Sequence, residues 1–140
     1  MQKRMKLLKN QKGMTLVELL AVLVILGIIA AIAVPLIGNM IENSRDKAAI
    51  NDAISIIAAA KLADSNGVAI PDGGYTSSTL SDYLEDGAST FTRVNKDSNG
   101  WYIVGHTNAL TAINKKLETD IANDGKLYES TLKDAAKGND

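Results

Sequence analysis

The segment from Met14 to Ile41 is almost entirely apolar, and this run constrains the fold more than any other feature of the chain. Its residues Leu19 to Ile37 are 19 consecutive positions without a charged side chain. As an α-helix they would extend about 28 Å, close to the ~30 Å hydrocarbon thickness of a bilayer. One carboxylate, Glu18, stands at the start of the run. Because a carboxylate at membrane depth costs up to ~3 kcal/mol, Glu18 requires an explanation.

Charge is distributed unevenly along the chain. Residues 1–13 contain five basic side chains and no acidic one, namely Lys3, Arg4, Lys6, Lys9 and Lys12. The remaining residues hold 10 basic and 16 acidic side chains, which gives that body a net charge of −6. Basic residues that precede an apolar helix stay on the cytoplasmic side of a membrane. We therefore expect a cytoplasmic N-terminus and an acidic body outside the cytoplasmic membrane.

The composition argues against several classes of function. The chain has no cysteine, so an exported body must fold without disulfides, and its acidity gives no general basis for binding nucleic acid. His106 is the only histidine, so zinc and Cys–His chemistry lack ligands, and we expect it to be structural or solvated. The segment 120–125 has several oxygen ligands near a turn but lacks the spacing of an EF-hand calcium loop. No carboxylate is paired with a nucleophile or base, so we expect a non-enzyme without cofactor or metal.

Two ordinary explanations of the apolar segment remain open. A secretory signal could be cleaved after Ala33, since Ala31-Ile32-Ala33 fits the small-residue pattern of such sites, and this would release a secreted domain. An uncleaved anchor would instead hold a membrane-tethered binding module outside the cell. Glu18 interrupts the signal pattern, and the plain anchor leaves this residue unexplained.

The residues Lys12-Gly13-Met14-Thr15-Leu16-Val17-Glu18-Leu19-Leu20 account for the basic leader, the glycine and the carboxylate together. This stretch closely resembles the processing site of type IV pilins and pseudopilins, and the likeness covers about residues 9–41. One departure is Met14, where phenylalanine is commonest in the family. The resemblance implies cleavage after Gly13 by a prepilin peptidase, which also methylates the new terminal amine of Met14. Glycine suits this position because a side chain would obstruct the backbone's approach to the protease.

The resemblance also implies a mode of assembly. Thr15, Leu16 and Glu18 belong to the assembly motif, and the Glu18 carboxylate would pair with the terminal amine of a neighbouring copy. The implied partners are the same protein, the peptidase, an assembly-platform membrane protein, a motor ATPase, and membrane lipid before assembly. Nucleic acid joins them only in a DNA-uptake pilus. The subunit would cross the membrane once and then enter an extracellular filament, either a pilus or a secretion pseudopilus.

Gly27 and Pro35 interrupt the apolar segment with residues that weaken helices. Proline removes a backbone hydrogen bond and glycine is entropically unfavourable in a helix interior. In relatives this stretch loosens when subunits pack in the filament, so the resemblance implies a point of flexibility. A simple membrane-helix kink is the alternative.

An amphipathic continuation of the helix is expected over residues 42–66, with Asn66-Gly67 as its stop. Ile50, Ile54, Ile57 and Ala58 recur at helical spacing, and Met40, Ile41, Ala53 and Leu62 extend the pattern. The remaining residues, 67–140, form a head too small for an independent core. We therefore expect Ile50, Ile54 and Ile57 to be buried beneath the sheet of the head.

Local patterns in the head predict short elements. These are a turn at 71–74, a helix at 78–84 capped by Ser77 or Ser78, strands at 90–94 and 101–104, a helix from Leu110 through Ile121 that ends at Gly125, and a strand around 126–128. Lys96 to Gly100 contains an Asn-Gly turn signal, so the two strands should form an antiparallel hairpin in which Asp97 and Asn99 serve as turn residues. Residues 133–140 are expected to be loosely ordered.

These elements together predict an α+β, pilin-like fold in which a long N-terminal helix packs against a small antiparallel sheet. The expected segments are a cleaved leader (1–13), a transmembrane and assembly helix (14–41), its amphipathic continuation (42–66) and a globular head (67–140).

Overall fold

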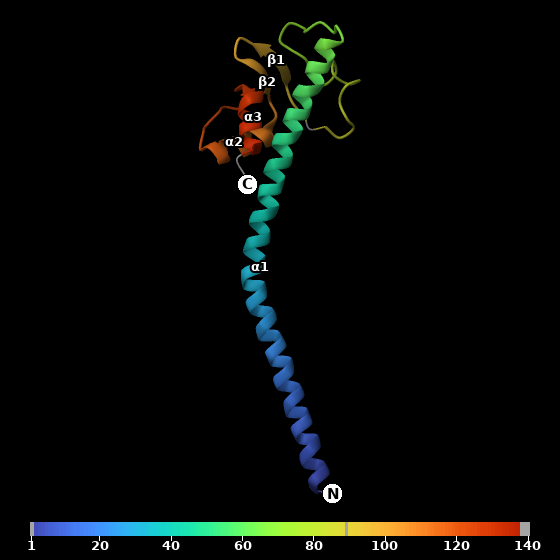
Figure 1. Cartoon of the computed structure of the whole chain (residues 1–140), viewed down its shortest axis with the longest axis vertical. Coiled ribbons are helices and arrows are strands. Elements are labelled where there is room, and N and C mark those ends of the chain that lie inside the picture. Colours follow the sequence, from blue (N-terminus) through green and yellow to red (C-terminus); the bar gives the residue numbers. More distant parts are fainter. Residues whose placement is uncertain (1, 89, 138–140) are drawn as a thin grey trace. The chain divides into compact units, whose positions relative to one another are not determined.

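The computed structural model describes residues 2–88 and 90–137, with side chains from residue 15 onward. The elements run in the order α1 (Gln2–Ser65), β1 (Arg93–Asp97), β2 (Gly100–Val104), α2 (Thr107–Leu117), β3 (Leu127–Tyr128) and α3 (Glu129–Lys137) (Figure 1). The predicted α+β class, with a long N-terminal helix and a small antiparallel sheet, is confirmed. The chain divides into two compact units, Met1–Glu42 and Asn43–Asp140, and α1 contributes residues to both.

In the second unit, α1 contributes one apolar face to the core. Residues spaced three or four apart place their side chains on this face, and those that belong to the core cluster are Ile50, Ala53, Ile56, Ile57, Ala60 and Ala63. The expectation that Ala58 and Leu62 share the face is wrong, because both are exposed, Leu62 to 54%. At 100° per residue they lie on the solvent side of the helix, and Ile56 occupies the edge of the core instead.

Gly67 ends α1 through its backbone conformation. Its φ of +85° is the left-handed conformation that glycine adopts without strain. The Val68 amide then donates to the Ala63 carbonyl (3.0 Å) and the Gly67 amide to the Asp64 carbonyl (3.1 Å). These two bonds form a Schellman motif and satisfy carbonyls that the last helical turn leaves open.

Three strands form the sheet in the order β1-β2-β3, all antiparallel. The register aligns Val94 with Ile103 and Ile103 with Leu127, so one apolar row crosses the sheet and joins the core. The predicted hairpin is present, but its first strand spans Arg93–Asp97 and not 90–94. The reason is the short turn, in which only Ser98 and Asn99 separate the strands, so pairing continues to Asp97 opposite Gly100.

The helix expected from Leu110 through Ile121 is displaced. α2 begins at Thr107 and ends at Leu117, because Glu118 adopts a left-handed conformation with φ of 51° and terminates it. Ile121 lies beyond the helix, where the Asn114 side chain holds its backbone. The Asn114 amide donates to the Ile121 carbonyl (3.0 Å), and its oxygen accepts from the Ile121 N–H (2.9 Å).

Residues 78–84 form consecutive turns and no regular helix. The cap also differs from the expectation, because Thr76 and not Ser77 or Ser78 bonds the following turn. The Thr76 N–H donates to the Thr79 hydroxyl (2.7 Å), while the Thr79 N–H donates to the Thr76 hydroxyl (3.4 Å). This segment buries Leu80 completely and packs the half-buried Tyr83 and Leu84 against the same core.

The expectation of a loose tail from Lys133 is wrong for residues 133–137. They belong to α3, in which Leu132 and Ala135 lie three positions apart and are buried in the core. Residues 138–140 of the predicted tail lie outside the described residues. The strand expected around 126–128 is present as Leu127–Tyr128 and pairs with β2.

Candidate assembly site

The first unit exposes a long apolar surface. Every side chain described from residue 15 to 42 is exposed except that of Ala33, which is half-buried. By length and composition, the described part of α1 could cross a membrane. Soluble monomers rarely expose contiguous apolar patches of more than a few hundred Å². This surface therefore requires lipid or other protein helices to cover it.

The motif residues lie at the start of this surface. Thr15, Leu16 and Glu18 are exposed, and Thr15 and Glu18 are three positions apart, so they share one face of α1. The backbone of Gly13 and Met14 belongs to α1, whereas the side chain of Met14 lies outside the described ones. Glycine lowers helix stability by about 1 kcal/mol relative to alanine, so the helix is intrinsically weaker at Gly13.

Gly27 and Pro35 both lie within α1, which continues through them. A Cβ atom placed on Gly27 would meet no atom within 4 Å outside the helix's own backbone, so packing within the chain does not require glycine there. Pro35 has no N–H, so the helical hydrogen bond to the Ala31 carbonyl is missing. The helix is thus weakened at a defined point within its apolar surface.

The three isoleucines expected beneath the head lie on or beside the core face of α1. Ile50 and Ile57 are buried, and Ile54 is half-buried and packed against the core cluster. That cluster also contains Val94 and Ile103 of the sheet. The second part of α1 therefore supplies apolar surface that the head lacks.

His106 joins the head to α1, a role that sequence reasoning missed. Its ring is 1% exposed, and Nδ1 accepts a hydrogen bond from the Ala109 N–H (3.1 Å) at the start of α2. Nδ1 is therefore an acceptor, so Nε2 carries the proton and donates to Asp52 Oδ2 of α1 (2.8 Å). Histidine is not a common N-cap residue, so its residue type did not predict a capping role. Its position just before a helical pattern was the only sequence signal for such a cap.

Replacing His106 with alanine is expected to lower the free energy of unfolding by about 2–3 kcal/mol. The change leaves the Ala109 N–H without its cap and removes one hydrogen-bond donor to Asp52. Urea unfolding of the detergent-solubilised chain, followed by fluorescence of the single tryptophan, Trp101, measures the effect. His106→Asn keeps a short capping oxygen but cannot reach Asp52, so it should lie between wild type and alanine. Equal stability of all three proteins would contradict this role.

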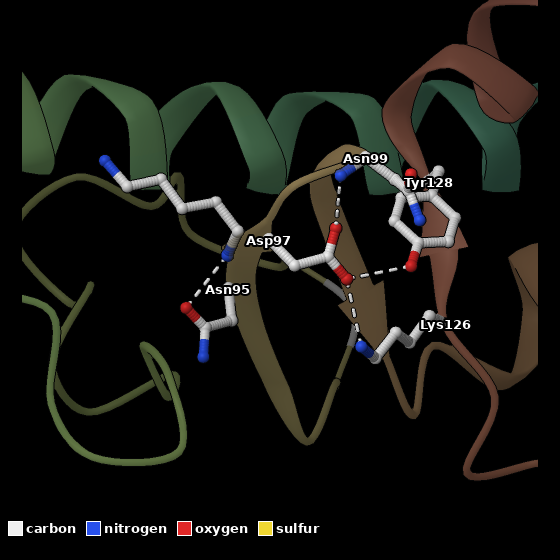
Figure 2. A network of polar contacts seen from close by, with 6 residues as sticks. Asn95, Asp97, Asn99, Lys126 and Tyr128 are labelled. Carbon is white, nitrogen blue, oxygen red and sulfur yellow. Dashed lines mark hydrogen bonds and ion pairs between the residues drawn. The ribbon is translucent and has the colours of Figure 1, made fainter.

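Asp97 ties the hairpin turn to the end of the sheet (Figure 2). It accepts hydrogen bonds from the Asn99 N–H (2.8 Å), Lys126 Nζ (3.0 Å) and the Tyr128 hydroxyl (2.9 Å). The hydrogen bond from Lys126 is the main reason that the pKa of Asp97 lies below its ordinary value. Lys126 Nζ also lies 4.5 Å from the centre of the Tyr102 ring. Asn99 is therefore a turn residue as expected, whereas Asp97 is the last residue of β1 and connects this strand with β3.

Glu129 forms an ionic link between the head and α1. Its carboxylate pairs with Lys61 of α1 and, at 2.5 Å, with Lys133 of α3. Burial acts to raise the pKa of Glu129, but the hydrogen bonds from Lys133 and Lys61 outweigh it and hold the pKa below the ordinary value.

The stability that Glu129 contributes is expected to depend on pH. Because the pKa of Glu129 is lower in the folded chain, the contribution to stability is complete at pH values above 4.5, the ordinary pKa of a glutamate. It should decrease as the pH falls below 4.5 toward the folded pKa. Urea unfolding between pH 6 and pH 3 should therefore show a smaller loss of stability for Glu129→Gln than for wild type. Asp82→Asn, at an exposed position, should retain the wild-type profile.

No metal site is evident among the described side chains. They contain no group of three or more His, Cys, Asp or Glu residues that could hold a metal ion. In the segment 120–125, the contacts found are the Asn114 amide on Ile121 and a backbone bond from the Gly125 N–H to the Ala122 carbonyl (2.8 Å).

A scan against protein families matches residues 8–34 to the prokaryotic N-terminal methylation motif. The amino-terminal segment is that of a type IV pilin-like prepilin. The match includes Gly13, Met14 and Glu18, and it ends just before Pro35. Neither the search of curated proteins nor that of solved structures found a match.

The pilin-like motif points to a structural subunit. It implies, in general, processing by a prepilin peptidase and self-assembly into filaments. The exposed apolar helix fits a pilin that is anchored in a membrane and later displayed at the cell surface. The matched segment is about a fifth of the 140 residues and contains none of the head.

Proposed function

We propose that this chain is a structural subunit of a type IV pilus or pseudopilus, cleaved after Gly13 and methylated at the new amine of Met14. The observation that carries the proposal is the exposed apolar surface of residues 15–42, which begins within the matched motif. Cleavage at this point removes the basic leader and leaves the apolar helix on the mature protein. The same helix can then be covered by lipid before assembly and by neighbouring helices afterwards.

The Glu18 carboxylate is the proposed register-setting group. After cleavage, the mature chain begins with an amine four residues before Glu18, and a neighbouring copy displaced along the helix axis can bring its amine to this carboxylate. In a medium of low dielectric constant the two charges attract strongly, and either charge alone is heavily penalised. Only an axial offset that pairs them is then favourable, so all copies would adopt the same stagger.

The proposed life cycle has two locations. The precursor crosses the cytoplasmic membrane once, with residues 1–13 in the cytoplasm, because the five basic side chains of the leader favour that side. An assembly-platform membrane protein and a cytoplasmic motor ATPase then add the subunit to an extracellular filament. Adhesion, motility, secretion and DNA uptake are all compatible with such a filament, and nucleic acid is a partner only in the last.

Mass spectrometry of the protein extracted from cells tests the proposal. We expect a chain that begins at a methylated Met14. A chain that begins at Met1 would instead indicate a membrane-tethered binding module, and one that begins at Val34 would indicate a secreted domain cleaved after Ala33.

Replacing Gly13 with leucine should leave the leader attached in nearly all molecules, because the side chain obstructs the peptidase cleft. Mass spectrometry of the membrane fraction measures the fraction cleaved. Gln11→Leu, two positions away, should be processed normally and serves as the matched control. Normal cleavage of Gly13→Leu would overturn the proposed processing site.

A further inference from the structure

An acidic groove runs along one flank of α1 in the second unit. Its volume is about 330 Å³, and its charged lining residues are the three carboxylates Asp52, Glu85 and Asp86. Apolar side chains complete it, including Leu62, which is 54% exposed. Glu85 and Asp86 are exposed and form no ion pair with any other described residue. The groove therefore combines uncompensated negative charge with an exposed apolar side chain.

A smaller basic pocket lies where α1 meets the end of α2. Its volume is about 130 Å³, and it is lined by Asn43, Asp46, Lys47, Ile50, Lys115 and Lys116. Three lysines and one carboxylate, that of Asp46, line the pocket. Lys115 pairs with Asp46 at 3.5 Å. Lys47 is exposed and pairs with no other described residue. The pocket thus has an excess positive charge.

The groove and the pocket lie on opposite flanks of α1. Successive residues of a helix are about 100° apart around its axis. By this measure, the mean direction of the α1 residues that line the groove lies roughly 150° from that of the α1 residues that line the pocket. The pocket is also about 15 Å nearer the amino-terminal end, by helix rise. Two different surfaces of one chain that complement each other, and that are offset along the axis, generate an open helical array and not a closed dimer.

We propose that the surface around the acidic groove of one copy packs against the surface around the lysine-lined pocket of the next copy. This contact would join the second units of neighbouring subunits in the filament, and it rests on the proposed function. The opposite charges of the two surfaces set the orientation, and the exposed Leu62 supplies apolar contact area. A second copy fits the groove because this chain itself carries the complementary surface.

Cysteine cross-linking tests the contact directly, because the chain has no cysteine of its own. Asn43→Cys places a thiol at the pocket and Ala58→Cys places one at the groove, and both positions are exposed. They are about 22 Å apart by helix rise, too far for a short thiol cross-linker to bridge within one chain. Filaments of the double variant should yield a ladder of covalent multimers on denaturing gels. Each single variant, and the pair Asn43→Cys with Ser98→Cys, should remain monomeric.

Charge exchange provides an independent test. Lys47→Glu alone and Glu85→Lys alone should each reduce the yield of filaments by about fivefold, the upper range for one exposed ion pair. The double variant restores opposite charges and should recover most of the yield. The amount of mature subunit in the membrane fraction shows that each variant is made and processed.

The outcomes separate this contact from the proposed function. Filaments that give no ladder with the double cysteine variant would overturn the contact alone. Charge reversals that are not rescued in combination would also overturn it. If the unaltered chain forms no filaments, the proposed function fails and the contact fails with it.

Discussion

Replacing Glu18 with alanine is expected to abolish surface filaments while membrane insertion and cleavage after Gly13 continue. The variant leaves the terminal amine of the neighbouring copy unpaired in an apolar environment. Breaking a buried ion pair in this way costs about 3–5 kcal/mol, which corresponds to more than a hundredfold change in the equilibrium for adding one subunit. Electron microscopy of sheared cell-surface material measures filaments, and mass spectrometry of the membrane fraction measures processing.

Two further variants separate charge from size at this position. Glu18→Gln has nearly the same shape without the charge and should fail like alanine. Glu18→Asp keeps the carboxylate on a shorter side chain and should retain part of the assembly. Normal filaments from Glu18→Ala would exclude the proposed pairing, and loss of cleavage in that variant would show that Glu18 acts at processing.

Replacing Ile57 with alanine is expected to lower the free energy of unfolding by about 2–5 kcal/mol. The side chain is fully buried between α1 and the head, so its removal leaves a cavity as well as lost apolar burial. Urea unfolding of the detergent-solubilised chain, followed by Trp101 fluorescence, measures the change. A loss of this size would remove much of the 5–15 kcal/mol that holds a typical domain folded.

Leu62→Ala is the matched control, because it removes an apolar side chain with the same number of atoms from the same helix at an exposed position. It should change the free energy of unfolding by at most about 0.5 kcal/mol. Equal effects of Ile57→Ala and Leu62→Ala would contradict the burial of one face of α1 beneath the head.

The elements that were predicted well have strong local signals. The apolar run and the isoleucine spacing predicted α1 from residue 14 onward, although the helix already begins at Gln2. Asn66-Gly67 predicted its end, where Gly67 adopts the left-handed conformation that glycine favours. The Asn-Gly signal predicted the hairpin because a short turn constrains the strands on either side of it. The processing motif required only residues adjacent in the chain.

The elements that were missed depend on distant partners. The start of α2 depends on His106, whose orientation is set by Asp52, 54 positions away in the chain. α3 has only nine residues, and a helix of that length is marginal in water unless its apolar face packs, as Leu132 and Ala135 do. The acidic groove combines residues of α1 with residues 83–88, and no sequence pattern indicates that these lie together.

The sequence by itself determined the processing motif, the apolar helix and the class of fold, because charge, hydrophobicity and helical spacing act over a few turns of chain. Only the tertiary structure decided which flank of α1 faces the core, where α2 begins, that the C-terminal segment is helical, and where the acidic groove and basic pocket form. The physical reason is that packing and hydrogen bonding between distant segments outweigh weak local preferences in a head that has too few residues for a core of its own.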